Sequence, residues 1–291
     1  MPEQRSHRNL QTEYSKQMAT DQPPQPPIPD RARASAEVVA EPSAHETEIA
    51  LAAVPAQPVF EYSDRQLATL VGALSTDRLQ PYFVYARSTD PWVAIRLYER
   101  NTKLSEALYG VVQALEVLLR NKIHSQMTKD IGADDWYEKV ALLEPEQNEI
   151  ANAKRAIADR PKPVTSGRVV AELNFGFWVR MFSGQYEKVF WVKHLHKIFA
   201  ASMQPKFLHD RLVQIKTFRN RIAHHETLIK RDVQKDYREI LQAIGWISPT
   251  VLAWVKTTNC FEARFAERIP KKPKVETATP PESPPTQANA Q

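Results

Sequence analysis

The segment FRNRIAHHE at residues 218–226, called the motif segment below, contains the side chains in this chain best suited to chemistry. It holds two arginines, an asparagine, two adjacent histidines and a glutamate within about two and a half helical turns. Histidine both accepts and donates protons near neutral pH, and arginine contacts a phosphate through two parallel hydrogen bonds. This combination indicates chemistry on a phosphodiester rather than packing.

Cleavage of RNA without a metal ion would give each of these side chains a role. The reaction needs a group that removes the 2′-hydroxyl proton, a group that protonates the leaving oxygen and a cation that stabilises charge on the phosphate. His224 is the candidate for proton transfer and Arg219 for the phosphate contact, with Asn220 and His225 assisting. One chain supplies only part of this machinery, whereas a symmetric dimer would supply two sets. The alternative is a structural cluster, because histidine and arginine near a helix C-terminus interact favourably with the helix dipole.

The spacing within the motif segment predicts which side chains share a helix face. Asn220 and His224 are four residues apart and therefore stack on one face. Arg221 and His225 form a second such pair, rotated by about 100°. Arg219 lies roughly 140° around the helix from His224, so the two converge only if the last turn loosens.

A second polar stripe interrupts an apolar helix that we expect to lie at the centre of the core. Glu116, Arg120 and His124 are spaced four residues apart, and Asn121 adjoins them. The stripe is either a solvated face with a Glu–Arg pair or the lining of the cleft into which the motif segment points. We treat these four residues and Arg221 as RNA-binding or supporting candidates.

The remaining histidines and the cysteine form no metal-binding pattern. His194, His196 and His209 share no helix face and lack a carboxylate partner in the pattern, which argues against a metal site. Cys260 is the only cysteine, so neither an intrachain disulfide nor a thiolate cluster can form. We predict a protein without a metal or a cofactor.

The elements that position these residues are predicted to be helices almost throughout. No stretch alternates with period two for long enough to predict a strand, so the fold class is all-α. We interpret the aromatic residues Trp178, Tyr186, Phe190 and Trp191 as core rather than as a platform for stacked bases. Capping residues and prolines predict helices that begin at the capping box 63–66 and at Asp90–Pro91. Capping residues, prolines and Gly132 also predict helices over residues 104–131, 145–160, 165–181, 194–200, 205 to the motif segment, 232–244 and 249–257.

The two ends of the chain differ in composition from the middle. Of the 22 prolines, 9 lie in residues 1–60 and 6 in residues 266–291, which leaves 7 for the 205 residues between them. Runs such as QPPQPPIP at 22–29 and PPESPP at 280–285 favour extended, solvated chain over a packed core. We therefore predict disordered proline-rich tails at both ends of one compact domain, residues 61–265.

Charge and hydropathy constrain the partners and the location. Residues 61–265 hold 30 of the 39 Lys and Arg and 23 of the 34 Asp and Glu, a net charge of +7 that suits a polyanionic partner. The longest apolar stretch, 107–119, is too short to span a bilayer. The N-terminus lacks the basic start and apolar run of a secretion signal. These features predict a cytoplasmic protein that does not enter a membrane.

Four blocks of this chain resemble, in the same order, the Abi-like (abortive infection) family of bacterial proteins, which is placed in the HEPN superfamily. Agreement in order makes the resemblance more specific than any single block, and it spans roughly residues 62–265. The blocks are LSEAL through EVLLRN (104–121), GFWV (176–179), RNRIAHHE (219–226) and IGWI (244–247).

The resemblance implies a HEPN-like helical bundle that forms a homodimer and cleaves RNA without a metal ion. The superfamily motif is an arginine, a polar residue and a histidine after four to six intervening residues. Arg219, Asn220 and His224 match it with four intervening positions, and His225 would match with five.

The implied function is that of an endoribonuclease in abortive infection and antiphage defence, or of a toxin. Its implied partners are RNA, a second copy of the chain, and a cognate antitoxin or non-coding RNA. Because the superfamily also includes inactive RNA binders, a non-catalytic RNA- or protein-binding component of a defence system is the alternative.

Overall fold

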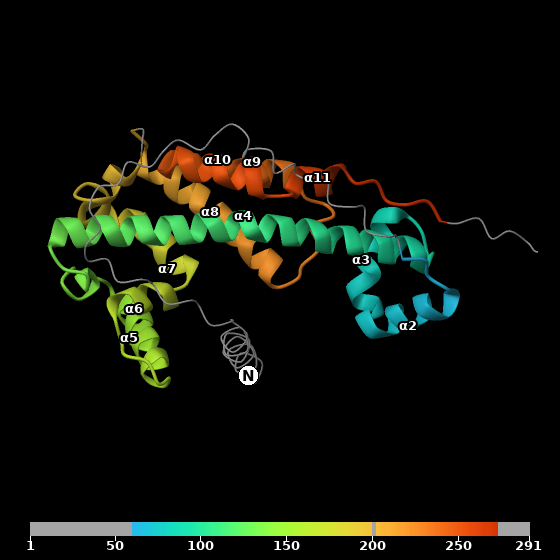
Figure 1. Ribbon diagram of the computed structural model, residues 1–291, viewed down its shortest axis with the longest axis horizontal. Coiled ribbons are helices and arrows are strands. Elements are labelled where there is room, and N and C mark those ends of the chain that lie inside the picture. Colours follow the sequence, from blue (N-terminus) through green and yellow to red (C-terminus); the bar gives the residue numbers. More distant parts are fainter. Residues whose placement is uncertain (1–59, 200–201, 273–291) are drawn as a thin grey trace, which may run out of the picture. The chain divides into compact units, whose positions relative to one another are not determined.

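The computed structural model describes residues 60–199 and 202–272, and every regular element within these ranges is a helix (Figure 1). This confirms the all-α fold class. The predicted tails lie outside the described residues, apart from Phe60 and residues 266–272. No helix in the described part of the chain is long and apolar enough to cross a membrane.

Helix α4, Pro91–Ile131, is the longest element, with 41 residues, and most other helices pack against it (Figure 1). The Asp90 side chain accepts a hydrogen bond from the Trp92 amide at 3.0 Å, and Gly132, with a φ of 77°, ends the helix as predicted. The prediction of two helices, one from 90 and one from 104, was wrong. No glycine or proline lies between residues 99 and 103, so nothing there ends the first helix. As a result, α4 connects two hydrophobic cores.

The larger core surrounds α4 from Leu104 to Met127. Helix α8, Pro205–Ala223, contains the first part of the motif segment and buries one face, on which the apolar residues recur every three or four positions: Leu208, Leu212, Ile215, Phe218 and Ile222. The other elements that contribute buried residues to this core include η1 (Trp136–Glu138), α5 (Glu144–Ala158), α9 (Val233–Ile247), α10 (Pro249–Thr258) and α11 (Phe261–Ala266).

The region predicted as one helix over 165–181 forms two helices instead, α6 (Ser166–Glu172) and α7 (Phe175–Arg180). Leu173 has an extended backbone, and the Asn174 side chain caps α7 by accepting a hydrogen bond from the Phe177 amide at 3.0 Å. Three short helices follow, η2 (Gly184–Tyr186), η3 (Glu187–Trp191) and η4 (Leu195–Ile198). The aromatic residues assigned to the core, Trp178, Tyr186, Phe190 and Trp191, are all buried, which confirms that interpretation.

The smaller core lies where α2 (Asp64–Leu74) and α3 (Thr76–Ala86) pack on the first turns of α4. The capping box is present, since Ser63 Oγ accepts from the Gln66 amide at 3.3 Å and Gln66 Oε1 accepts from the Ser63 amide at 2.9 Å. Helix α3 was not predicted, because Pro81 lies inside it and proline is a poor indicator of a helix interior. Leu79 and Tyr82 of α3 are nevertheless fully buried.

The chain continues to contact α4 beyond the predicted domain boundary at 265. The Arg100 guanidinium donates to the Phe265 carbonyl at 2.7 Å. Lys103 pairs with Glu267 at 3.0 Å, and Lys272 pairs with Asp90 at 2.8 Å. Part of the segment assigned to the C-terminal tail therefore packs alongside the first half of α4.

An ion-pair cluster fastens the end of α4 to η4. Asp130 Oδ2 lies 2.8 Å from His194 Nδ1 and 2.7 Å from Lys197 Nζ. The statement that His194 lacks a carboxylate partner was therefore wrong, because Asp130 lies 64 residues earlier and no local spacing relates the two. Hydrogen bonds from Lys197 and then from His194 hold the pKa of Asp130 well below its ordinary value of 3.8.

We expect Asp130→Asn to destabilise the protein at neutral pH and to have a smaller effect in acid. A depressed carboxyl pKa stabilises the fold above the unfolded pKa of 3.8, and this contribution disappears as the pH falls through the folded pKa. Because the partner Lys197 is partly exposed, the loss should be no more than about 1 kcal/mol. Urea unfolding of both proteins at pH 7 and pH 3 measures the difference. Asp210→Asn, which breaks an exposed pair with Lys206, is the control, and an equal effect of both variants would contradict the expectation.

Candidate functional site

The motif segment closes α8 with a complete Schellman motif. Helix α8 ends at Ala223, and His225 follows the cap residue with a left-handed φ of 55°. This conformation is uncommon for a side chain other than glycine or asparagine. Two backbone hydrogen bonds form the motif, from the His225 amide to Ile222 O at 3.0 Å and from the Glu226 amide to Arg221 O at 2.9 Å. The last helical bond precedes them, from the His224 amide to Asn220 O at 2.9 Å.

This geometry keeps one of the two predicted side-chain pairs and breaks the other. His224 has a near-helical backbone (φ −90°, ψ 11°), so it stays on the same face as Asn220. The predicted pairing of Arg221 with His225 was wrong, because the left-handed backbone takes His225 out of the helical register. Arg221 instead pairs with Glu226, with Nε 3.3 Å from Oε2. Asn220, His224 and His225 are all exposed and thus accessible to a substrate.

Arg219 is held by Glu116 of α4. Its Nε donates to Glu116 Oε1 at 2.8 Å, and the two side chains are 30% and 23% exposed. The first residue of the second polar stripe therefore meets the motif segment, across 103 residues of sequence. A contact through Nε leaves the two terminal nitrogens of the guanidinium outside this bond, and these are the atoms that contact a phosphate oxygen pair.

Burial raises the pKa of Glu116 above its ordinary value, while the neighbouring guanidinium groups of Arg219 and Arg120 act in the opposite direction. The net direction is upward because loss of solvation outweighs both arginines. Glu116 thus lies in a partly desolvated position in which its charge depends on these two cations. Glu116 is therefore a half-buried anchor for Arg219 rather than the partner in a fully exposed ion pair.

The other residues of the second polar stripe contact parts of the structure other than the motif segment. Arg120 Nη1 donates weakly to Ala171 O at 3.3 Å, and its buried Nε has no hydrogen-bond partner among the described residues. His124 Nδ1 lies 3.0 Å from the indole N–H of Trp136, and burial lowers the pKa of His124, so it serves as a neutral acceptor in the core. Asn121 is exposed in a hollow between α4 and α10. Only Glu116, with Arg120 beside it, joins the candidate site.

One residue that contacts the candidate site, Arg78, was not identified from the sequence pattern. Arg78 of α3 donates from Nη1 to the backbone oxygen of His225 at 2.6 Å. It is exposed, it is 147 residues from His225 in the sequence, and it belongs to a helix that was not predicted. No local pattern marked it. On the other side of the same turn, Asn101 Oδ1 of α4 accepts from the Leu228 amide at 2.7 Å, so two elements fix the backbone that follows His224.

The described residues contain no group of three or more His, Cys, Asp or Glu side chains placed to hold a metal ion. A scan against models of protein families, a search of curated proteins and a search of solved structures each found no match to this chain.

Proposed function

We propose that this chain is a metal-independent endoribonuclease of the HEPN type and a member of the Abi-like family, acting in bacterial abortive infection or as a toxin. The observation that carries the proposal is the pairing of Arg219 with Glu116 next to an exposed face formed by Asn220 and His224. The guanidinium held by Glu116 and the accessible imidazole at the end of the same helix are two of the three groups that metal-free RNA cleavage requires.

In the proposed reaction, the 2′-oxygen of a ribose attacks the adjacent phosphorus and the bond from phosphorus to the 5′-oxygen breaks. His224 transfers a proton, either from the 2′-hydroxyl group or to the departing 5′-oxygen. The terminal nitrogens of Arg219 stabilise the charge that develops on the non-bridging phosphate oxygens. The products are a 2′,3′-cyclic phosphate and a 5′-hydroxyl group, so atoms and protons balance without a further reactant.

A second copy of the chain completes this scheme. One His224 performs only one of the two proton transfers, and a homodimer that brings two motif segments together supplies the other. Because Asn220, His224 and His225 are all exposed, this end of α8 is accessible to such a partner as well as to RNA. A toxin of this kind also requires restraint in its own cell, for which a cognate antitoxin or a non-coding RNA is the proposed partner.

The alternative function is that of a non-catalytic RNA- or protein-binding component of a defence system. The ion pair of Arg219 with Glu116 favours it, because a carboxylate beside the arginine weakens the positive potential that a phosphate would meet. Under this alternative, RNA co-purifies intact, and its affinity falls steeply with salt concentration.

Incubation of the purified protein with total cellular RNA in the presence of EDTA tests the proposal. We expect the wild-type protein to cleave RNA and the Arg219→Ala/His224→Ala double variant to leave it intact. Circular dichroism and thermal melting must show that the variant keeps its helical content. Equal cleavage by both proteins would contradict the assignment of these residues, and intact RNA with both proteins would favour the binding alternative.

A further inference from the structure

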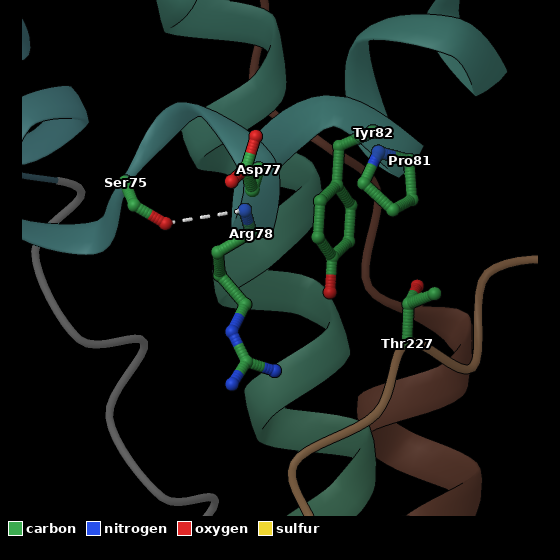
Figure 2. A pocket seen from close by; sticks show the side chains of 6 residues that line it. All are labelled: Ser75, Asp77, Arg78, Pro81, Tyr82 and Thr227. Atoms are coloured by element: carbon green, nitrogen blue, oxygen red, sulfur yellow. Dashed lines mark hydrogen bonds between the residues drawn. The ribbon is translucent and has the colours of Figure 1, made fainter. Parts of the chain in front are cut away.

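A hollow of about 390 Å³ lies between α3 and the turn that follows the motif segment (Figure 2). Its volume is within the range of about 300–1,000 Å³ typical of small-molecule sites. Figure 2 shows the Arg78 side chain and the Tyr82 ring extending alongside each other, with the Tyr82 hydroxyl directed toward Thr227. The lining residues are Ser75, Asp77, Arg78, Pro81, Tyr82 and Thr227.

The hollow is attached directly to the candidate site. Thr227 is the next residue after the motif segment and forms one wall. Arg78 forms another wall and donates to the backbone oxygen of His225. Tyr82 anchors the floor, because its ring is 1% exposed in the smaller core. One wall of the hollow therefore lies two residues along the backbone from His225 and three from His224.

The charged groups at this hollow form no ion pair with each other or with other described residues. Within residues 60–199 and 202–272, no carboxylate lies within 4 Å of Arg78 and no cation within 4 Å of Asp77. Both side chains are exposed. Arg78 uses Nη1 for His225, which leaves Nε and Nη2 as donors. The hollow thus presents cationic donors, a carboxylate acceptor and the hydroxyl groups of Ser75 and Thr227.

We propose that this hollow is a subsite for one nucleotide of the RNA next to the cleaved bond, an inference that rests on the proposed function. Arg78 contacts the phosphate of that nucleotide through its remaining donors. The base enters the hollow beside Pro81, and Asp77 accepts a hydrogen bond from its exocyclic amino group. Because a carboxylate repels a bare phosphate and the carbonyl oxygens of uracil, the subsite selects adenine, cytosine or guanine over uracil.

The phosphate contact is tested by RNA binding in a His224→Ala background, which prevents cleavage during the measurement. The probe is a labelled single-stranded RNA of mixed sequence, and its affinity is measured by fluorescence anisotropy at several salt concentrations. We expect Arg78→Ala to weaken binding about tenfold and to reduce the salt slope by about 0.7, the value for one phosphate contact on a single strand. Arg65→Ala on α2 removes the same charge from an exposed position outside the hollow and is expected to bind like the parent.

The salt slope separates phosphate binding from an indirect effect on His225. If Arg78 only positioned the turn, Arg78→Ala would weaken binding with an unchanged slope, and this result would overturn the phosphate contact. Arg78→Lys keeps the charge and is expected to retain the parent slope. Melting curves for each variant show whether the fold is intact, and equal losses in Arg78→Ala and Arg65→Ala would also contradict the proposal.

The base contact is tested by cleavage with the otherwise wild-type protein. The substrates are short RNAs that differ at a single position, 5′ or 3′ of the cleaved bond, and carry uracil or an amino-bearing base there. We expect wild-type protein to prefer the amino-bearing base on one side of the bond by about tenfold, and Asp77→Ala, which removes the acceptor oxygens, to lose most of this preference. Cleavage by the wild type with no base preference, or an unchanged preference in Asp77→Ala, would refute the subsite and leave the proposed function intact. Absence of both cleavage and binding would refute the proposed function itself.

Discussion

Replacing His224 with alanine is expected to reduce RNA cleavage by about a thousandfold, whereas His225→Gly should stay within about tenfold of the wild-type rate. His224 keeps a near-helical backbone and shares a face with Asn220, four residues before it. His225 leaves the helix with a φ of 55° and has its carbonyl held by Arg78. The first geometry keeps an imidazole on the helix face that carries Asn220, and the second does not.

Glycine is the informative replacement at position 225. It adopts a positive φ without the steric penalty that other residues incur, so His225→Gly removes the imidazole while the Schellman motif persists. Relief of the left-handed strain should also raise the unfolding free energy by about 1 kcal/mol. Single-turnover cleavage and urea unfolding of both variants provide the measurements. A large loss in His225→Gly with an active His224→Ala would reverse the two assignments, and full activity in both would exclude histidine catalysis at this site.

Predictions from local sequence signals were correct where the physical cause is local. Asp90 caps the first turn of α4, Gly132 ends that helix, and the box at Ser63 starts α2, because each acts through hydrogen bonds within four residues. The apolar period of α8 likewise determines which side of that helix is buried.

Predictions failed in two situations. In one, a helix continued because no residue ended it; in the other, contacts between residues far apart in the sequence determined the structure. Helix α4 continues through residues 99–103 because nothing there stops it, and a pause in the apolar pattern is not a stop. Arg221 binds Glu226 rather than stacking on His225, because the helix ends at Ala223, two residues before His225. The contacts of Arg78 and Asp130 join segments 147 and 64 residues apart, for which a single sequence gives no signal. The contact between Glu116 and Arg219 was predicted only in part, because the sequence allowed the polar stripe to be either a solvated face or the lining of a cleft next to the motif segment.

Replacing Glu116 with alanine is expected to reduce the rate of cleavage about a hundredfold, with a smaller change in RNA affinity. Without the carboxylate, the Arg219 guanidinium samples several rotamers and loses its fixed approach to the phosphate. Glu116→Gln keeps an oxygen that accepts from Arg219 Nε and should recover most of the rate. Glu116 would then be a positioning residue, which acts on the reaction through Arg219. The measurement is the separate effect of each variant on kcat and KM.

The stability of these variants distinguishes lost positioning from lost folding. An acid whose folded pKa is raised binds protons more readily in the folded state, so its ionisation opposes folding as the pH rises above the ordinary value of 4.5. Glu116→Gln removes this unfavourable ionisation and should melt at or above the wild-type temperature at pH 7. A lower cleavage rate in a variant that melts normally would then reflect lost positioning of Arg219 rather than lost folding. Faster cleavage or tighter RNA binding in Glu116→Ala would mean that the carboxylate competes with phosphate for Arg219. In either case Glu116 restrains the site, and tighter RNA binding without any cleavage would support the non-catalytic alternative.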